Sequence, residues 1–341
     1  VYQPHFGHPY PVHLDEWSRL LETTHIIEEG SFNNRYNPQF VGHPDAPRRL
    51  NPGFQFILSQ FYISSGVDPV NFFQFLPAIF AVLTGFILFT FLTRISNYWT
   101  GLFGIIFLAF MKTNDNTLGI SLLVALTMTF PLLYGMMYSL YKAFEEKNSL
   151  FILLASLSYF CILVVHEQTG ASFFPIISLF LIISIVTFFA KNGLDIPFSF
   201  RGVAVIGASL IIPVFSLYVA RSWLWKGSIQ KTWEYLLKLM VWEGTSSIIY
   251  PYNFILFYGS ILSILALVGI MLLYRNLDMN VFFVWSLVSV GQVVLFYFNH
   301  LTYLSSIARI RHVAVLGLVP LSAYGLYSVL DMSKGLLKKN P

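Results

Sequence analysis

Hydrophobic and polar residues are distributed very unevenly along the chain. The first 50 residues are polar and rich in histidine, whereas most of the chain after Asn71 consists of long apolar runs separated by short polar junctions. In lipid, runs of this kind satisfy their backbone hydrogen bonds only as helices. The pattern therefore predicts an all-α polytopic membrane protein with a polar opening loop.

Nine apolar segments qualify as candidate spans, with ends defined to within several residues. They cover residues 71–93, 98–112, 117–142, 149–165, 170–190, 202–220, 252–273, 279–298 and 311–330. A further apolar stretch, Phe54 to Ile63, is too short to span and follows Asn51-Pro52-Gly53. It is predicted to be a surface or re-entrant helix.

Basic residues at alternate junctions predict the orientation of these spans. They are Arg94, Lys142, Lys147, Lys191, Arg201, Arg275, Lys334, Lys338 and Lys339. The positive-inside rule places them in the cytoplasm, so residues 1–70 lie outside and the C-terminus lies inside. A chain that opens at Val1 in a polar external loop is then expected to have lost one N-terminal span.

The pattern divides the chain into four regions. Residues 1–70 form an extracytoplasmic loop with surface helices, 71–220 are transmembrane helices, 221–251 are an extracytoplasmic interfacial loop, and 252–341 are transmembrane helices and a cytoplasmic tail. The 221–251 segment mixes tryptophan with lysine, which is typical of a helix lying along lipid headgroups. It is either an anchoring belt or a flap that contacts substrate.

Composition narrows the class of protein further. Hydrophobic residues make up 56% of the chain and charged residues only 11%, and the mean hydropathy of +0.67 lies far from that of soluble proteins. The net charge of +4 is scattered along the chain, so nucleic-acid binding has no support. The single Cys161 excludes a disulfide framework within the chain.

The opening loop contains a helical pattern that begins near Leu14. Apolar residues recur at helical spacing through Ile27, and a different face carries Asp15, Arg19 and Glu22. The pattern predicts an amphipathic helix that is held to the protein by Trp17 and Leu21 and presents its acidic first turn to water. Asp15 and Glu16 diverge by about 100°, so one acts while the other orients a partner or binds a metal. Alternatively, both acids simply favour the helix dipole.

Several stretches resemble GT-C superfamily membrane glycosyltransferases. Val12-His13-Leu14-Asp15-Glu16-Trp17 resembles the Asp-Glu type motif of their first external loop. Leu50-Asn51-Pro52-Gly53-Phe54 is similar to the segment that opens their second loop helix, with Gly53 in place of the usual second proline. Arg309-Ile310-Arg311-His312 is similar to the start of their arginine-bearing last helix.

This resemblance implies a GT-C-like helical bundle with an external loop bearing amphipathic helices. It also implies an enzyme of the dolichyl-phosphate-mannose mannosyltransferase or aminoarabinose transferase-like group. Such an enzyme moves a hexose or pentose from a polyprenyl-phosphate carrier to an extracytoplasmic lipid, glycan or protein, with inversion expected. The implied location is the cell membrane, with the active site extracytoplasmic. No Trp-Trp-Asp-Tyr-Gly motif is present, which argues against an oligosaccharyltransferase.

The required chemistry points to particular residues. A carboxylate must take the proton of the acceptor hydroxyl, which indicates Asp15 or Glu16. Cations must stabilise the departing phosphate, which indicates Arg309 and Arg311 with His312 as a helper. Further candidate substrate contacts are Arg19, Arg48, Arg49, Lys112, His166 and Glu167. The alternatives are interfacial cations for the arginines and a polar helix cap for His166 and Glu167.

The sequence is compatible with more than one cofactor requirement and more than one function. No cofactor is certain, and a divalent cation is an open option, although loop histidines without a carboxylate cluster indicate a metal site only weakly. A transporter or flippase of lipid-linked sugars is the main alternative, and it predicts ionisable residues deep within the spans. A structural membrane protein would leave the acidic loop unexplained.

Overall fold

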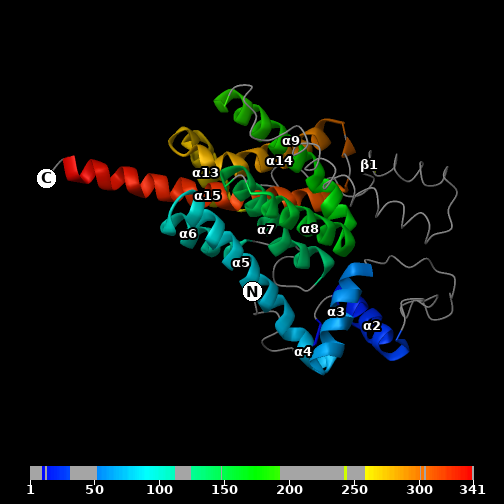
Figure 1. The fold of residues 1–341 in the computed structure, drawn as a ribbon. Coiled ribbons are helices and arrows are strands. Elements are labelled where there is room, and N and C mark those ends of the chain that lie inside the picture. Colours follow the sequence, from blue (N-terminus) through cyan, green and yellow to red (C-terminus); the bar gives the residue numbers. More distant parts are fainter. Residues whose placement is uncertain are drawn as a thin grey trace.

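The computed structural model describes residues 10–11, 14–30, 52–111, 124–146, 148–192, 242–243, 258–299, 301–302 and 305–339. Within these ranges the regular structure is helical, apart from one ladder of two-residue strands (Figure 1). The α-helices are α2 (Leu14–Glu29), α3 (Pro52–Ser65), α4 (Pro69–Phe72), α5 (Leu76–Ile95), α6 (Tyr98–Phe110), α7 (Ala125–Glu146), α8 (Ser149–Val165), α9 (Glu167–Asn192), α13 (Ser260–Met271), α14 (Asn280–Asn299) and α15 (Ile307–Lys339).

Short 3₁₀ turns and one strand pair complete the described elements. The turns are η1 (Phe73–Phe75), η2 (Leu273–Arg275) and η3 (Leu277–Met279). The strands β1 (Trp242–Glu243) and β2 (Leu301–Thr302) are antiparallel, with Trp242 opposite Thr302. This ladder attaches part of the predicted 221–251 segment to the stretch that leads into α15.

Side-chain caps determine where several helices begin. The Asp68 carboxylate accepts a hydrogen bond from the Asn71 N–H at 2.8 Å, and Asn97 Oδ1 accepts one from the Thr100 N–H at 3.0 Å. Asn148 Oδ1 caps α8 by accepting from the Leu150 N–H at 2.9 Å. These short polar side chains satisfy amide groups that the first turn of a helix leaves free. Because of these caps, one apolar helix can begin only a few residues after the previous one ends.

Four helices are long and apolar enough to cross a membrane, judged by their length and composition. They are Pro69–Ile95, Glu167–Ser184, Leu277–Phe298 and Arg309–Lys334. Three predicted spans are shorter apolar helices, at Tyr98–Phe110, Leu150–Val165 and Ser260–Met271. The predicted helical membrane protein is confirmed to this extent. The segment 202–220 lies outside the described residues.

Three junctions that were predicted to share one side of the membrane lie at the same end of the bundle. Arg94 at the end of α5 donates a hydrogen bond to the Glu145 carboxylate at the end of α7, at 2.8 Å. Asn276, between η2 and η3, donates to the Ile95 carbonyl at 2.8 Å. Helices α8 and α14 both begin near this end and run away from it. Helices α9 and α15, which follow them in the chain, therefore begin at the opposite end, where α2 and α3 also lie (Figure 1).

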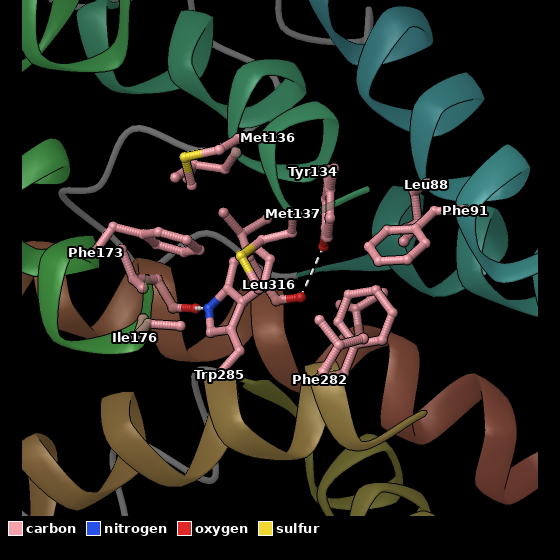
Figure 2. Packing of buried hydrophobic residues seen from close by; sticks show 14 of the residues in the cluster. Leu88, Phe91, Tyr134, Met136, Met137, Phe173, Ile176, Phe282, Trp285 and Leu316 are labelled. Carbon is pink, nitrogen blue, oxygen red and sulfur yellow. Dashed lines mark hydrogen bonds between the residues drawn. The ribbon is translucent and has the colours of Figure 1, made fainter. Parts of the chain in front are cut away.

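The main core joins α7, α9, α14 and α15 around a buried tryptophan. Figure 2 shows Trp285 of α14 between the side chains of Met137 and Phe173. The Trp285 indole donates to the Val313 carbonyl at 2.7 Å, and the Tyr134 hydroxyl donates to the Leu316 carbonyl, also at 2.7 Å. Each buried aromatic therefore packs as a hydrophobic group and also has its polar atom satisfied.

Helices α13 and α15 cross at two glycines. A Cβ on Gly325 would overlap the Leu265 carbonyl oxygen, and a Cβ on Gly269 would overlap the Leu321 carbonyl oxygen. Nearby, the Ser322 hydroxyl donates to the Leu262 carbonyl at 2.8 Å. Small residues and a hydroxyl at a helix crossing let two backbones approach closely in an apolar surrounding.

We expect Gly325→Ala to destabilise the protein by about 1–3 kcal/mol, because the new methyl group must displace backbone rather than a flexible side chain. Gly291→Ala in α14 is the matched control, since no atom of the described residues lies within 4 Å of the added Cβ. That change should be neutral or stabilise by up to ~1 kcal/mol. Thermal unfolding in detergent measures both, and equal midpoints would contradict the close crossing.

Candidate functional site

The buried face of α2 differs from the predicted one. Trp17 and Leu21, expected to hold the helix on the protein, are 37% and 44% exposed. Glu16, expected in water, is fully buried, and Leu20 and Thr23 are buried on the same side. The predicted water-facing first turn is therefore wrong for Glu16. The helix buries a partly polar face because Glu22 on that face is hydrogen-bonded to Gln55 of α3.

The Glu22 carboxylate joins α2 to α3. This side chain is 5% exposed and accepts a hydrogen bond from Arg19 Nη1 at 3.0 Å and another from the Gln55 amide. Charged groups remain buried only when they are paired and hydrogen-bonded. Neither Gln55 nor this role of Glu22 was predicted, because a contact between residues 33 positions apart leaves no periodic signal.

Helix α3 rests in turn on the end of α8. A Cβ on Gly53 would meet the Val164 carbonyl oxygen at 2.7 Å, so the first turn of α3 touches the last turn of α8. Leu20, Phe54 and Val165 share one hydrophobic cluster around this contact. The contact explains why glycine occupies this position, since any Cβ here would overlap the end of α8. It places the α2–α3 layer beside His166.

His166 is the joint between α8 and α9. Its N–H donates to the Ile162 carbonyl at 2.8 Å, which ends α8. Its carbonyl accepts from the Thr169 N–H at 3.0 Å, and its Nδ1 accepts from the same N–H at 3.2 Å. The Thr169 hydroxyl lies 2.7 Å from Nδ1. Because Nδ1 is an acceptor, the neutral ring carries its proton on Nε2.

Residues from two distant segments interact electrostatically with this histidine. Burial lowers the pKa of His166 well below its ordinary value of 6.5, and electrostatic interaction with Arg309, Arg19 and His312 lowers it further. Arg19 comes from α2, while Arg309 and His312 come from the first turns of α15. The structure thus brings together four of the residues that the sequence indicated as a donor or substrate site.

The neighbouring Arg311 and Glu167 complete this end of the bundle. Arg311 is 6% exposed, and its charge interacts with the Tyr297 hydroxyl near the end of α14. Glu167 is half-buried in the first turn of α9. Arginines in the first turns of α15 lie where the helix dipole is already positive, an arrangement that favours a bound anion.

Some predicted site residues cannot be placed in this group. Arg48, Arg49 and Lys112 lie outside the described residues, and Asp15 is described only as part of the backbone of α2. Over the described ranges, no group of three or more His, Cys, Asp or Glu side chains could hold a metal ion.

Comparison with known proteins does not assign this end of the bundle. No protein-family model matches the chain, and no curated protein matches it.

The lowered pKa of His166 predicts a pH dependence of stability. The unfolded state binds a proton near pH 6.5 and the folded state does not, so stability should fall as the pH drops below about 6.5. The slope contributed by this residue is about 1.4 kcal/mol per pH unit until the folded pKa is reached. His166→Asn keeps an oxygen that can cap α9 and should remove this contribution.

Thermal unfolding of wild type and His166→Asn between about pH 7 and pH 5 tests the point. The wild type should lose stability relative to the variant on acidification, since other titrating groups are common to both proteins. Parallel curves would contradict a neutral, buried His166.

Proposed function

We propose that this chain is a membrane glycosyltransferase that moves a sugar from a polyprenyl-phosphate carrier to an acceptor at the extracytoplasmic surface. The observation that carries the proposal is that Arg19 of α2 and Arg309 and His312 of α15 all act electrostatically on His166 at one end of the membrane helices. A lipid phosphate lies at the end of the hydrocarbon layer, where the two arginines also lie. On the positive-inside argument this end is extracytoplasmic.

The reaction needs few groups. The acceptor oxygen attacks the anomeric carbon of the sugar and loses its proton to a carboxylate of the protein. The bond from the anomeric carbon to the phosphate oxygen breaks, and the polyprenyl phosphate leaves with both bonding electrons. Arg309 and Arg311 stabilise the negative charge that develops on that phosphate, because guanidinium groups match phosphate oxygens.

The base is assigned to the first turn of α2. Asp15 precedes Arg19 by one helical turn, and the Arg19 charge reaches His166. Glu16 is buried in the same turn. We assign Asp15 as the general base and Glu16 as its orienting partner. Placing both on one short helix beside the cations brings the carboxylate and the phosphate site to the same surface.

The distribution of charge favours this enzyme over a transporter. In the four described spans, the Asp, Glu, Lys and Arg residues lie near the ends of the helices: Arg94, Glu167, Asp278, Arg309, Arg311, Asp331 and Lys334. A transporter would place ionisable residues deep in the spans, along the path of its substrate. Charges confined to the ends support chemistry at the membrane surface.

The first test concerns the base. Asp15→Asn keeps the shape of the side chain and removes its basicity, so turnover should fall by about 10²-fold or more. Folding should survive, because an acidic residue in the first turn of a helix contributes only ~0.3–1 kcal/mol through the dipole. The measurement is sugar transfer from a polyprenyl-phosphate sugar by purified protein in liposomes.

Glu16→Gln serves as the comparison variant and should lose less turnover than Asp15→Asn. The reverse order would assign the proton transfer to Glu16. Normal transfer by both variants would rule out the proposed mechanism.

The second test concerns the donor phosphate. Arg309→Ala and Arg311→Ala should each weaken use of the donor by on the order of 2–5 kcal/mol, because a poorly solvated phosphate would lose its charged partner. Lysine at either position should restore only part of the loss, since it lacks the bidentate guanidinium. Transfer rate against donor concentration measures the effect.

Arg275→Ala is the matched control, because Arg275 is exposed at the opposite end of the bundle. It should leave the kinetics unchanged. Wild-type kinetics in both Arg309→Ala and Arg311→Ala would show that these residues only anchor the helix.

A further inference from the structure

A buried glutamine lies on the inward face of α14. Trp285, Ser289, Gln292 and Phe296 follow one another at helical spacing, and all four are buried. Gln292 is 7% exposed and belongs to the candidate span Leu277–Phe298. Within the described part of the chain, neither its Oε1 nor its Nε2 has a hydrogen-bond partner.

This arrangement is unfavourable for the protein by itself. A buried amide without partners destabilises the fold, whereas methionine would fill a similar volume without that penalty. Ser289, one turn earlier, behaves differently, because its hydroxyl donates to the Trp285 carbonyl at 2.7 Å. A side-chain amide offers two N–H donors and an acceptor oxygen. In Gln292 these groups form no hydrogen bond within the described part of the chain.

The contact between α14 and α15 shows which layer of the bundle Gln292 occupies. The Trp285 indole donates to the Val313 carbonyl. Gln292 lies two helical turns further along α14, about 10 Å away and on the same face of the helix. Arg309 precedes Val313 by one turn on the antiparallel α15. Val293, adjacent to Gln292, packs in one cluster with Ile307 and Ile310. Gln292 therefore lies level with the first turns of α15.

The contact between α14 and α9 gives the same level independently. Phe173 of α9 packs edge to face on Trp285, with ring centroids 4.6 Å apart. Because the two helices run in opposite directions, moving seven residues outward from each contact reaches Gln292 on α14 and His166 at the start of α9. The uncharged amide and the cationic group around His166 occupy the same layer.

We propose that Gln292 is a binding residue that recognises hydroxyl groups of the sugar carried by the phosphate. A neutral amide cannot balance the charge of a phosphate, whereas its paired donor and acceptor complement a hydroxyl, which is itself donor and acceptor. The arginines of α15 bind the phosphate, and the Gln292 amide forms hydrogen bonds with hydroxyl groups of the sugar next to it. This inference rests on the proposed function and adds a residue that determines sugar specificity.

The experiment compares two kinds of probe on purified protein in detergent. One is farnesyl phosphate, and the other is farnesyl phosphate bearing glucose, mannose or N-acetylglucosamine. Gln292→Met should weaken binding of the preferred sugar-bearing probe by about 10-fold, the worth of a lost buried hydrogen bond. Binding of farnesyl phosphate should stay unchanged. Ser289→Ala, the matched control, should leave both affinities unchanged.

Thermal unfolding without probe supplies a second readout. Gln292→Met should have the same midpoint as wild type or a higher one, because it removes an unsatisfied buried amide. A lowered midpoint would show that Gln292 serves the fold, and this would overturn the inference.

The remaining outcomes separate the inference from the proposed function. Equal binding of the sugar-bearing probe by wild type and Gln292→Met would overturn the role of Gln292 and leave the donor site intact. An equal loss for both kinds of probe would also overturn it, since sugar recognition would not be involved. Failure of wild type to bind any of the four probes would overturn the proposed function itself.

Discussion

The arrangement of the site depends on one buried histidine that ends one helix and begins the next. The N–H of His166 ends α8, and its carbonyl and Nδ1 satisfy the start of α9. Helix α3 rests on the last turn of α8, two residues before this histidine, through the close approach of Gly53 to Val164. The position of this joint therefore determines where the loop helices sit relative to α15.

Charge around the joint has a consistent physical logic. Burial holds the pKa of His166 well below its ordinary value, and electrostatic interaction with Arg309, Arg19 and His312 adds to this, so the neutral ring is favoured. A protonated His166 ring would be repelled by the neighbouring arginines. Its Nδ1 would carry a proton and could no longer accept the hydrogen bond from the Thr169 N–H that caps α9. A bound anion, in contrast, is attracted both by the cations and by the dipole of α15. This end of the bundle thus favours a bound anion, which is the charge that the proposed polyprenyl-phosphate carrier would bring.

The sequence predicted what local patterns encode and failed where distant contacts decide. The apolar runs correctly predicted a helical protein with membrane-length apolar helices, and the basic junctions correctly predicted the shared end of Arg94 and Arg275, since both follow from the cost of polar groups in lipid. The face of α2 was wrong because apolar spacing cannot register the Glu22–Gln55 contact. His166 was expected at the end of a span, but its neighbours on α2 and α15 depend on packing.

The three acidic residues early in α2 serve different ends. Glu22 is held between α2 and α3 by Arg19 and Gln55, so its carboxylate is already engaged in joining the loop helices. The same Arg19 guanidinium that pairs with Glu22 also acts electrostatically on His166. The proposed proton transfer is therefore assigned to Asp15 or Glu16, about two turns earlier on the helix. Because the Glu22 carboxylate fixes α2 against α3, the first turn of the helix is held at a defined position, as the proposed general base would require.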